Sequence, residues 1–112
     1  MRPVFYLFLS LASFNAFAGN YATCLIQHMP GLNNDSAAYA AGRLCIKEHP
    51  AGLQAVEQGS GRSFFAYKSG AECTLKKGGE TRSQVAGRMI FVACNRLYDE
   101  TPKFDPTTAR PE

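Results

Sequence analysis

The sequence predicts a mainly all-α fold, a small bundle of two helical hairpins that are each closed by a disulfide. Cys24 and Cys45 are 21 positions apart, and so are Cys73 and Cys94. Both pairs span the same succession of helix signals, offset by 49 residues. The chain has 112 residues, of which 46% are hydrophobic. That length suits one domain and excludes a multidomain enzyme or a transporter.

The first 18 residues have the pattern of a secretory signal peptide. Arg2 provides a positive start, positions 4–12 form an apolar run, and small residues stand at Ala16 and Ala18. This pattern predicts cleavage after Ala18. A membrane-spanning helix needs about 20 apolar residues, more than this segment supplies. We therefore expect export to the periplasm or the medium, with no membrane span after cleavage.

The chain after the leader divides into a domain and a tail. Residues 19–99 are expected to form a single helical domain. Residues 100–112 contain three prolines and one large apolar side chain, Phe104. This composition predicts a flexible tail.

An even number of cysteines in an oxidising compartment predicts two disulfides. Pairing within each half is our first choice. Cys45 lies further from the turn along its helix than Cys24 does, and the five residues 30–34 are long enough to make up this difference. The nested alternative, Cys24 with Cys94 and Cys45 with Cys73, stays open. A metal site would favour two cysteines separated by two residues, a spacing that is absent. No metal and no cofactor are expected.

The first hairpin is predicted from its capping and breaking residues. A short helix over 21–29 ends at Pro30, and Asn34 or Asp35 caps a second helix that runs to about His49. This second helix has an unusually smooth surface, so we expect it to lie in the middle of the fold. Its small residues are Ala37, Ala38, Ala40, Ala41 and Gly42.

The second hairpin repeats the plan with different residues. Ser69 and Glu72 form a predicted capping box for a short helix through Lys77. Thr81, with Gln84 three positions on, is the predicted cap of a longer helix to about Tyr98. An apolar stripe on this helix indicates a packed face. The stripe consists of Ala86, Ile90, Ala93 and Leu97.

The connection between the hairpins contains few large apolar residues before position 63. A turn of helix is expected at 53–57, and Gly59-Ser60-Gly61 indicates a flexible link. Residues 63–67, Ser-Phe-Phe-Ala-Tyr, could form a short strand or a loop that plugs the core.

No group of residues indicates catalysis. His28 and His49 stand at predicted helix C-termini, where the backbone dipole favours them. Ser60 and Ser63 lack the Gly-x-Ser-x-Gly order of a nucleophile elbow. We therefore expect a protein that is not an enzyme, most simply a binding or interaction module. A small secreted effector or hydrolase that uses these serines or histidines, and a structural or envelope-stress protein without a ligand, are the alternatives.

Charge indicates where such a module could bind. Residues 62–96 contain seven basic and two acidic side chains. With the neighbouring aromatic residues they form a candidate surface for an unknown protein or an anionic envelope component. A solvated, solubilising face is the simpler explanation. Nucleic acid is not expected, because no recognition motif is present. The candidate residues are Arg62, Phe64, Phe65, Tyr67, Lys68, Lys76, Lys77, Arg82 and Arg88.

Several short motifs resemble a group of short, uncharacterised bacterial exported proteins with four cysteines. The motifs are Cys-Leu-Ile-x-x-Met-Pro-Gly at 24–31, Asn-Asp at 34–35, Tyr-x-Ser-Gly-x-Glu-Cys at 67–73 and Cys-x-x-Leu-Tyr at 94–98. The resemblance covers about residues 21–98. It implies a bacterial, exported protein, and it brings no catalytic or binding residues.

Overall fold

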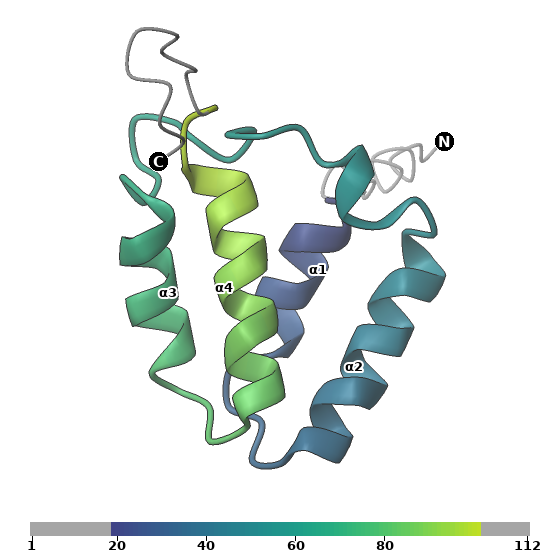
Figure 1. The fold of residues 1–112 in the computed structure, drawn as a ribbon. Coiled ribbons are helices and arrows are strands. Elements are labelled where there is room, and N and C mark those ends of the chain that lie inside the picture. The colour runs from purple at the N-terminus through teal and green to yellow at the C-terminus, as the bar shows by residue number, and fades with distance from the viewer. Residues whose placement is uncertain (1–18, 102–112) are drawn as a thin grey trace, which may run out of the picture.

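The computed structural model describes residues 19–101, and it forms a bundle of four α-helices with one short 3₁₀ turn (Figure 1). The described part contains no strand, so the predicted all-α class is confirmed. The predicted leader and residues 102–112 of the predicted tail lie outside it. None of the described helices is long and apolar enough to cross a membrane. The elements are α1 (Tyr21–His28), α2 (Asp35–Glu48), η3 (Gly52–Ala55), α3 (Gly70–Gly78) and α4 (Gln84–Tyr98).

Each hairpin is closed by its own disulfide. Cys24 and Cys45 join α1 to α2 with their Cα atoms 5.7 Å apart. Cys73 and Cys94 join α3 to α4 at 5.6 Å. Both separations are typical of disulfides. The preferred pairing is thus confirmed, and the nested pairing is not adopted.

The 49-residue offset extends from the cysteines to the start of every helix. The four N-caps are Asn20, Asn34, Ser69 and Ser83, and each side chain accepts a hydrogen bond from the first turn of its helix. Asn20 and Ser69 are 49 positions apart, as are Asn34 and Ser83. The two halves therefore share one plan down to the residue at which each helix begins.

One predicted cap is wrong and another is half correct. Ser83, not Thr81, caps α4, and its Oγ accepts from the Ala86 N–H at 3.0 Å. The Thr81 hydroxyl instead donates to the Leu32 carbonyl at 2.6 Å, so it serves a contact between the hairpins. Ser69 caps α3 as predicted, but the Glu72 carboxylate accepts from the N–H of Lys68, one residue before the cap.

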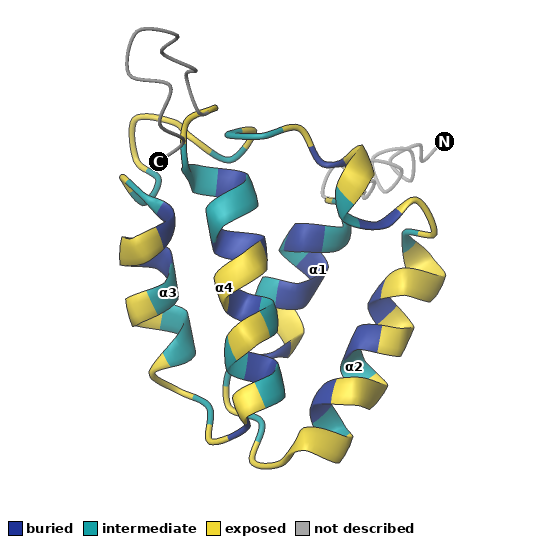
Figure 2. Cartoon of the chain, viewed as in Figure 1, coloured by how far each residue is buried: buried dark blue, intermediate teal, exposed yellow. Residues whose placement is uncertain are grey.

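The central helix is α4, which packs against the other three helices. Figure 1 shows it between α3 and α2 and in front of α1. The predicted stripe of α4 is buried along its length, from Ala86 to Leu97 (Figure 2). The core around this stripe consists of Ala22, Leu25, Met29, Ala38, Val56 and the four cysteines.

The expectation that α2 lies in the middle of the fold is wrong. Only one of its faces is buried, through Ala38, Gly42 and Cys45. A Cβ atom on Gly42 would lie 3.2 Å from Cε of Met89, so the small residues serve a close approach on that face alone. Leu44, on the outer face, is 62% exposed.

The equivalent turns of the two hairpins lie side by side. The Gly31 N–H donates to the Glu80 carbonyl at 3.0 Å, and the Arg82 N–H donates to the Leu32 carbonyl at 3.0 Å. Next to them the Ser83 hydroxyl donates to the Asp35 carboxylate at 2.6 Å. These bonds fix the two hairpins to each other at the end of the bundle where α2 and α4 begin.

Residues 63–67 form an irregular loop, and the alternatives of a strand or a core plug are not realised. A single strand has no partner in an all-helical bundle, so its backbone groups would stay unpaired. Phe64 and Phe65 are 90% and 92% exposed. Within this stretch only Tyr67 packs against the core.

Candidate functional site

The basic and aromatic candidates separate into two groups in the structure. Lys76 and Lys77 lie in the last turn of α3, Arg82 follows in the turn to α4, and Arg88 is exposed in the first half of α4. Arg62, Lys68 and the aromatic residues precede the first turn of α3. A helix of nine residues separates these positions by roughly 13 Å. The aromatic group, at the end of the bundle where α4 terminates, is called the aromatic end here.

The aromatic end is built on the last turn of α4, because the connecting segment satisfies its free carbonyl groups. The N–H groups of Gly59 and Gly61 donate to the carbonyls of Arg96 and Leu97 at 2.7 and 2.8 Å. Gln58 Nε2 donates to the Asn95 and Asp99 carbonyls at 2.8 and 3.0 Å. Helix C-termini leave such carbonyls unpaired. The link that was predicted to be flexible is thus bonded to α4 along its length.

Arg62 closes the base of the 63–67 loop. One guanidinium nitrogen donates to the carbonyls of Tyr98, at 2.6 Å, and Lys68, at 3.2 Å. The other lies 3.4 Å from Glu100 in an exposed ion pair. The loop is therefore anchored at the two residues that flank it, and Phe64 and Phe65 project from the bundle between them.

Two glycines allow the chain to approach α4 this closely. A Cβ atom on Gly61 would lie 2.9 Å from the Tyr98 ring, and one on Gly70 would lie 2.7 Å from Cα of Asn95. The Gly70 N–H also donates to the Asp99 carboxylate at 2.8 Å. Asp99 thereby places a negative charge at the N-terminus of α3, where the helix dipole favours it.

The exposed part of the loop is a pair of phenylalanine rings. The rings of Phe64 and Phe65 are 4.9 Å apart between centroids and meet edge to face, at 79°. An aromatic side chain buries about 150–250 Å² when covered. Two neighbouring phenylalanines with this exposure form a large apolar contact surface on a domain of this size.

A hollow of about 560 Å³ lies beside this pair. On one wall Tyr67 and Tyr98 pack edge to face with centroids 5.3 Å apart. Burial, and secondarily the nearby Tyr67, raise the pKa of Tyr98 above its usual value. Like any tyrosine phenol it is neutral at neutral pH, and it can donate a hydrogen bond. The hollow is lined by Phe65, Ala66, Tyr67, Lys68, Glu72 and Tyr98.

A second, more polar hollow of about 610 Å³ shares Lys68 with the first. It is lined by Gln58, Arg62, Lys68, Asn95, Asp99 and Glu100. The sequence gives no signal for Gln58, Asn95 or Asp99, because only the fold brings these distant positions together. With Glu57, Glu72 and two acidic groups of this hollow, carboxylates are at least as numerous as basic groups at the aromatic end. The part of this end within residues 19–101 is therefore not basic.

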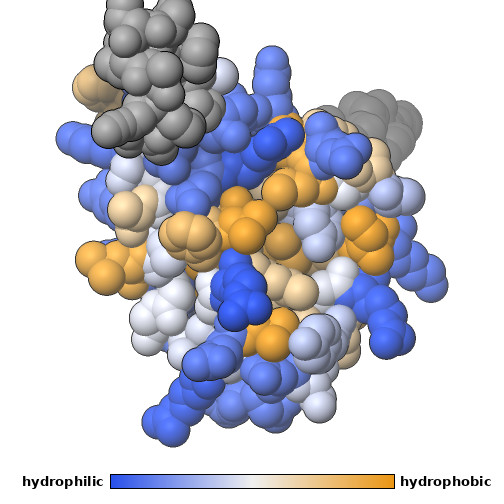
Figure 3. Space-filling model, in the orientation of Figure 1, coloured by the Kyte–Doolittle hydropathy of each residue, from blue (hydrophilic) through white to orange (hydrophobic). Residues whose placement is uncertain are grey.

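Another apolar area lies on the face shown in Figure 3, where hydrophobic side chains gather over α4 and the helices beside it. Phe91 and Val92 of α4 are 50% and 40% exposed. Leu75 of α3 is also exposed.

The residues proposed for an alternative hydrolase do not form one site. His28 lies in the last turn of α1, and His49 is the C-cap of α2, at the opposite end of the bundle. Ser60 and Ser63 are exposed in the connecting segment. Among residues 19–101, no hydrogen bond joins either serine hydroxyl to a histidine.

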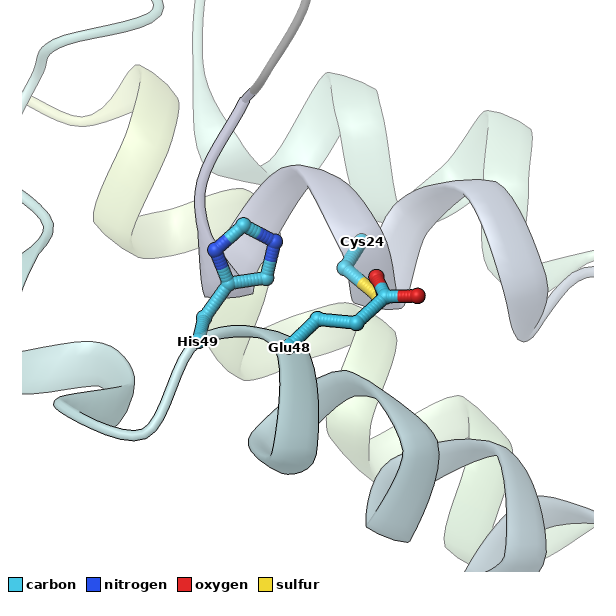
Figure 4. Close-up of side chains that lie close together, drawn as sticks. All are labelled: Cys24, Glu48 and His49. Carbon is cyan, nitrogen blue, oxygen red and sulfur yellow. The ribbon is translucent and has the colours of Figure 1, made fainter.

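Cys24, Glu48 and His49 lie together at the C-terminus of α2 (Figure 4). One potential ligand atom from each lies within 4.8 Å of the others, and Sγ of Cys24 is 3.9 Å from Oε1 of Glu48. Because Cys24 is bonded to Cys45, its sulfur has no proton to donate and is not a thiolate. Metals bind the thiolate form of cysteine. With the disulfide intact, the cluster therefore offers only a carboxylate and an imidazole.

Comparisons of the chain with protein-family models, with curated proteins and with solved structures give no match.

Proposed function

We propose that the chain is an exported, non-catalytic binding module whose aromatic end docks into an apolar recess of a partner protein. The observation that carries the proposal is the exposure of Phe64 and Phe65, at 90% and 92%, on a loop anchored by Arg62. Aromatic residues held in a fixed position are typical energetic centres of protein interfaces. They lose little conformational entropy on binding when the loop is already ordered.

A protein partner is favoured over an anionic envelope component by the charges around this loop. The Arg62 guanidinium is already paired with Glu100, and Glu72 and Asp99 lie close by. An anionic surface would be repelled by these carboxylates as much as it is attracted by Lys68. A partner recess with an apolar floor and a mixed polar rim fits this arrangement.

Export is supported by the two disulfides and by the leader pattern of residues 1–18. Disulfides form and persist in oxidising compartments. Cleavage after Ala18 would give a chain that starts at Gly19, one residue before the first N-cap, Asn20. The mass of the product recovered from the periplasm or medium of an expressing bacterium tests this proposal, because retention of the leader would contradict it.

Site-specific photocrosslinking tests the binding surface. A photoreactive amino acid at position 65 should capture one partner reproducibly, whereas the same group at Phe91 should not. A photoreactive amino acid placed at position 68 instead should capture the same partner. The double substitution Phe64→Ser/Phe65→Ser should abolish this capture. Phe91→Ser is the matched control, since it also removes an exposed phenylalanine. Equal capture from positions 65 and 91, or capture that survives the double substitution, would contradict the proposal.

A further inference from the structure

The two disulfides are equivalent in the repeat, but only one of them has metal-binding side chains next to it. Positions 48 and 49 are Glu and His, whereas their equivalents 49 residues later are Leu97 and Tyr98. Leu97 is buried in the core. The first disulfide therefore lies beside two potential ligands, and the second lies beside apolar and aromatic groups.

The four donor groups of the first hairpin come from facing helix segments. Cys45, Glu48 and His49 occupy one turn at the C-terminus of α2, where residues three and four apart share a face. Cys24 faces them from α1, and its sulfur is bonded to that of Cys45. Figure 4 shows the Glu48 carboxylate and the His49 imidazole on the side of α1 that carries Cys24.

The separations of three of these groups, Cys24, Glu48 and His49, approach those around a tetrahedral zinc ion. With Zn–S bonds of about 2.3 Å and Zn–N bonds of about 2.0 Å, ligand atoms around zinc are roughly 3.3–3.8 Å apart. The atoms of Cys24, Glu48 and His49 already lie within 4.8 Å of one another. Cys45 lies outside this group of three, but its sulfur is bonded to that of Cys24, and after reduction the two sulfur atoms would move apart to about 3.8 Å to share one zinc ion. Thiolate, imidazole and carboxylate are the ligand types that zinc takes in proteins.

We propose that reduction of the Cys24–Cys45 disulfide converts this cluster into a Zn²⁺ site with Cys24, Cys45, Glu48 and His49 as ligands. A dithiol supplies two electrons and two protons and becomes a disulfide, while the S–S bond breaks and each cysteine sulfur becomes a thiol. Zinc binding then displaces both thiol protons to solvent and leaves two thiolates on the metal. The inference does not depend on the proposed binding function of the aromatic end.

Access favours reduction of this disulfide. Cys24 retains 4% exposure and is bordered by the exposed Glu48, whereas Cys45, Cys73 and Cys94 are fully buried. Disulfide exchange requires that the reductant reach a sulfur atom. The site is therefore specific to the first hairpin both in its ligands and in its accessibility.

Zinc titration of the whole protein, reduced without oxygen by a phosphine, tests the proposal. The phosphine takes the oxygen of water as it reduces each disulfide, and it adds no thiol that competes for zinc. The reduced protein should bind one Zn²⁺, and the oxidised protein should bind none in the same concentration range. Zinc should slow the alkylation of Cys24 and Cys45 relative to the zinc-free reduced protein and leave the alkylation rates of Cys73 and Cys94 unchanged.

Two substitutions on the surface separate a built site from general binding by free thiols. His49→Ala and Glu48→Gln should each weaken zinc binding by at least about tenfold, since loss of even an outer partner of a ligand costs that much. His28→Ala is the matched control, because it removes the other histidine from a helix end, and it should leave the affinity unchanged. No zinc in the reduced protein, equal protection of all four cysteines, or equal effects of the two histidine variants would each overturn the proposal.

Discussion

At the scale of single residues, the contact of Asp35 with Ser83 holds the two long helices together. The Ser83 hydroxyl, and secondarily the Val85 backbone N–H, donate to the Asp35 carboxylate and lower the pKa of Asp35. Ser83 is itself buried and caps α4. The Asp35 carboxylate thus lies in the first turn of α2 and also accepts hydrogen bonds from residues at the start of α4.

This contact predicts a specific acid dependence of stability. Because the pKa of Asp35 is lower in the folded than in the unfolded chain, the contact stabilises the fold above the unfolded pKa, and this contribution is lost as the pH falls through the folded value. Asp35→Asn should therefore lower the melting temperature at pH 6 and reduce its decline between pH 5 and pH 2. Thermal unfolding followed by circular dichroism measures both effects. Glu80→Gln, which removes an exposed carboxylate of the adjoining turn, is the control, and an equal change in its slope would contradict the assignment.

Gly70 gives a second prediction at the residue scale. Gly70→Ala should destabilise the fold by about 1–3 kcal/mol, because the added methyl group overlaps the backbone of α4 at Asn95. Urea unfolding measures the loss. Gly78→Ala, at the other end of α3, is the control, since a Cβ atom there meets nothing closer than 3.7 Å. Equal losses in both variants would show that close packing at Gly70 is not the cause.

Residue roles were predictable where they depend on near neighbours in the chain. Ser69 was identified as a cap, and Asn34 as one of two candidates with Asp35, because a cap bonds to residues two or three positions on. Thr81 was misassigned because its hydroxyl bonds to Leu32, 49 positions away. The cluster of Cys24 with Glu48 and His49 was missed for the same reason, since a search for closely spaced cysteines does not find ligands on facing helices.

At the scale of elements, the C-terminus of α4 is capped by a segment from a distant part of the sequence. Gln58→Ala should cost about 1–2 kcal/mol, because it removes the side-chain donor to the Asp99 carbonyl and one of the two donors to the Asn95 carbonyl, which also accepts from the Asp99 N–H. Chemical denaturation measures this. Gln54→Ala is the matched control, because Gln54 is exposed in η3 and makes no side-chain hydrogen bond within the described chain. A loss from Gln54→Ala as large as that from Gln58→Ala would contradict this role.

The existence of the helices was predictable, whereas their placement was not. Caps, proline and glycine set the ends of α1 to α4 to within one or two residues of the expected positions. The central place of α4 depends on its contacts with all three of the other helices, and these contacts form only when the bundle packs. The connecting segment was expected to be flexible because it contains glycine, but its glycines serve close backbone contacts with α4.

At the scale of the whole molecule, two equal covalent loops stabilise a small core. The entropy lost by the unfolded chain depends on loop length, and both disulfides span 21 positions. Replacing Cys24 and Cys45 by alanine, or Cys73 and Cys94 by alanine, should therefore cost similar amounts, roughly 2–5 kcal/mol each. Denaturant unfolding of the two variants tests this. A difference as large as either loss would mean that native packing, rather than loop closure, determines the contribution.

The architecture was predictable from the sequence because the disulfides and helix signals repeat at one spacing. The relative position of the hairpins was not, since it depends on backbone bonds between the turns at 31–32 and 80–82. The candidate surface was predicted as one area because its residues are close in sequence, yet α3 separates them along its length. Its aromatic members are adjacent in sequence, which is why that part remained together.

Because each disulfide lies within a hairpin, only the connecting peptide between His49 and Ser69 links the hairpins covalently. The exposed Phe64–Phe65 bond lies in this peptide, where a chymotrypsin-like protease could cut it. A single cut there would convert the folded chain into a complex of two fragments, each still a closed loop. Dilution of the cut protein would then measure directly how strongly one hairpin recognises the other.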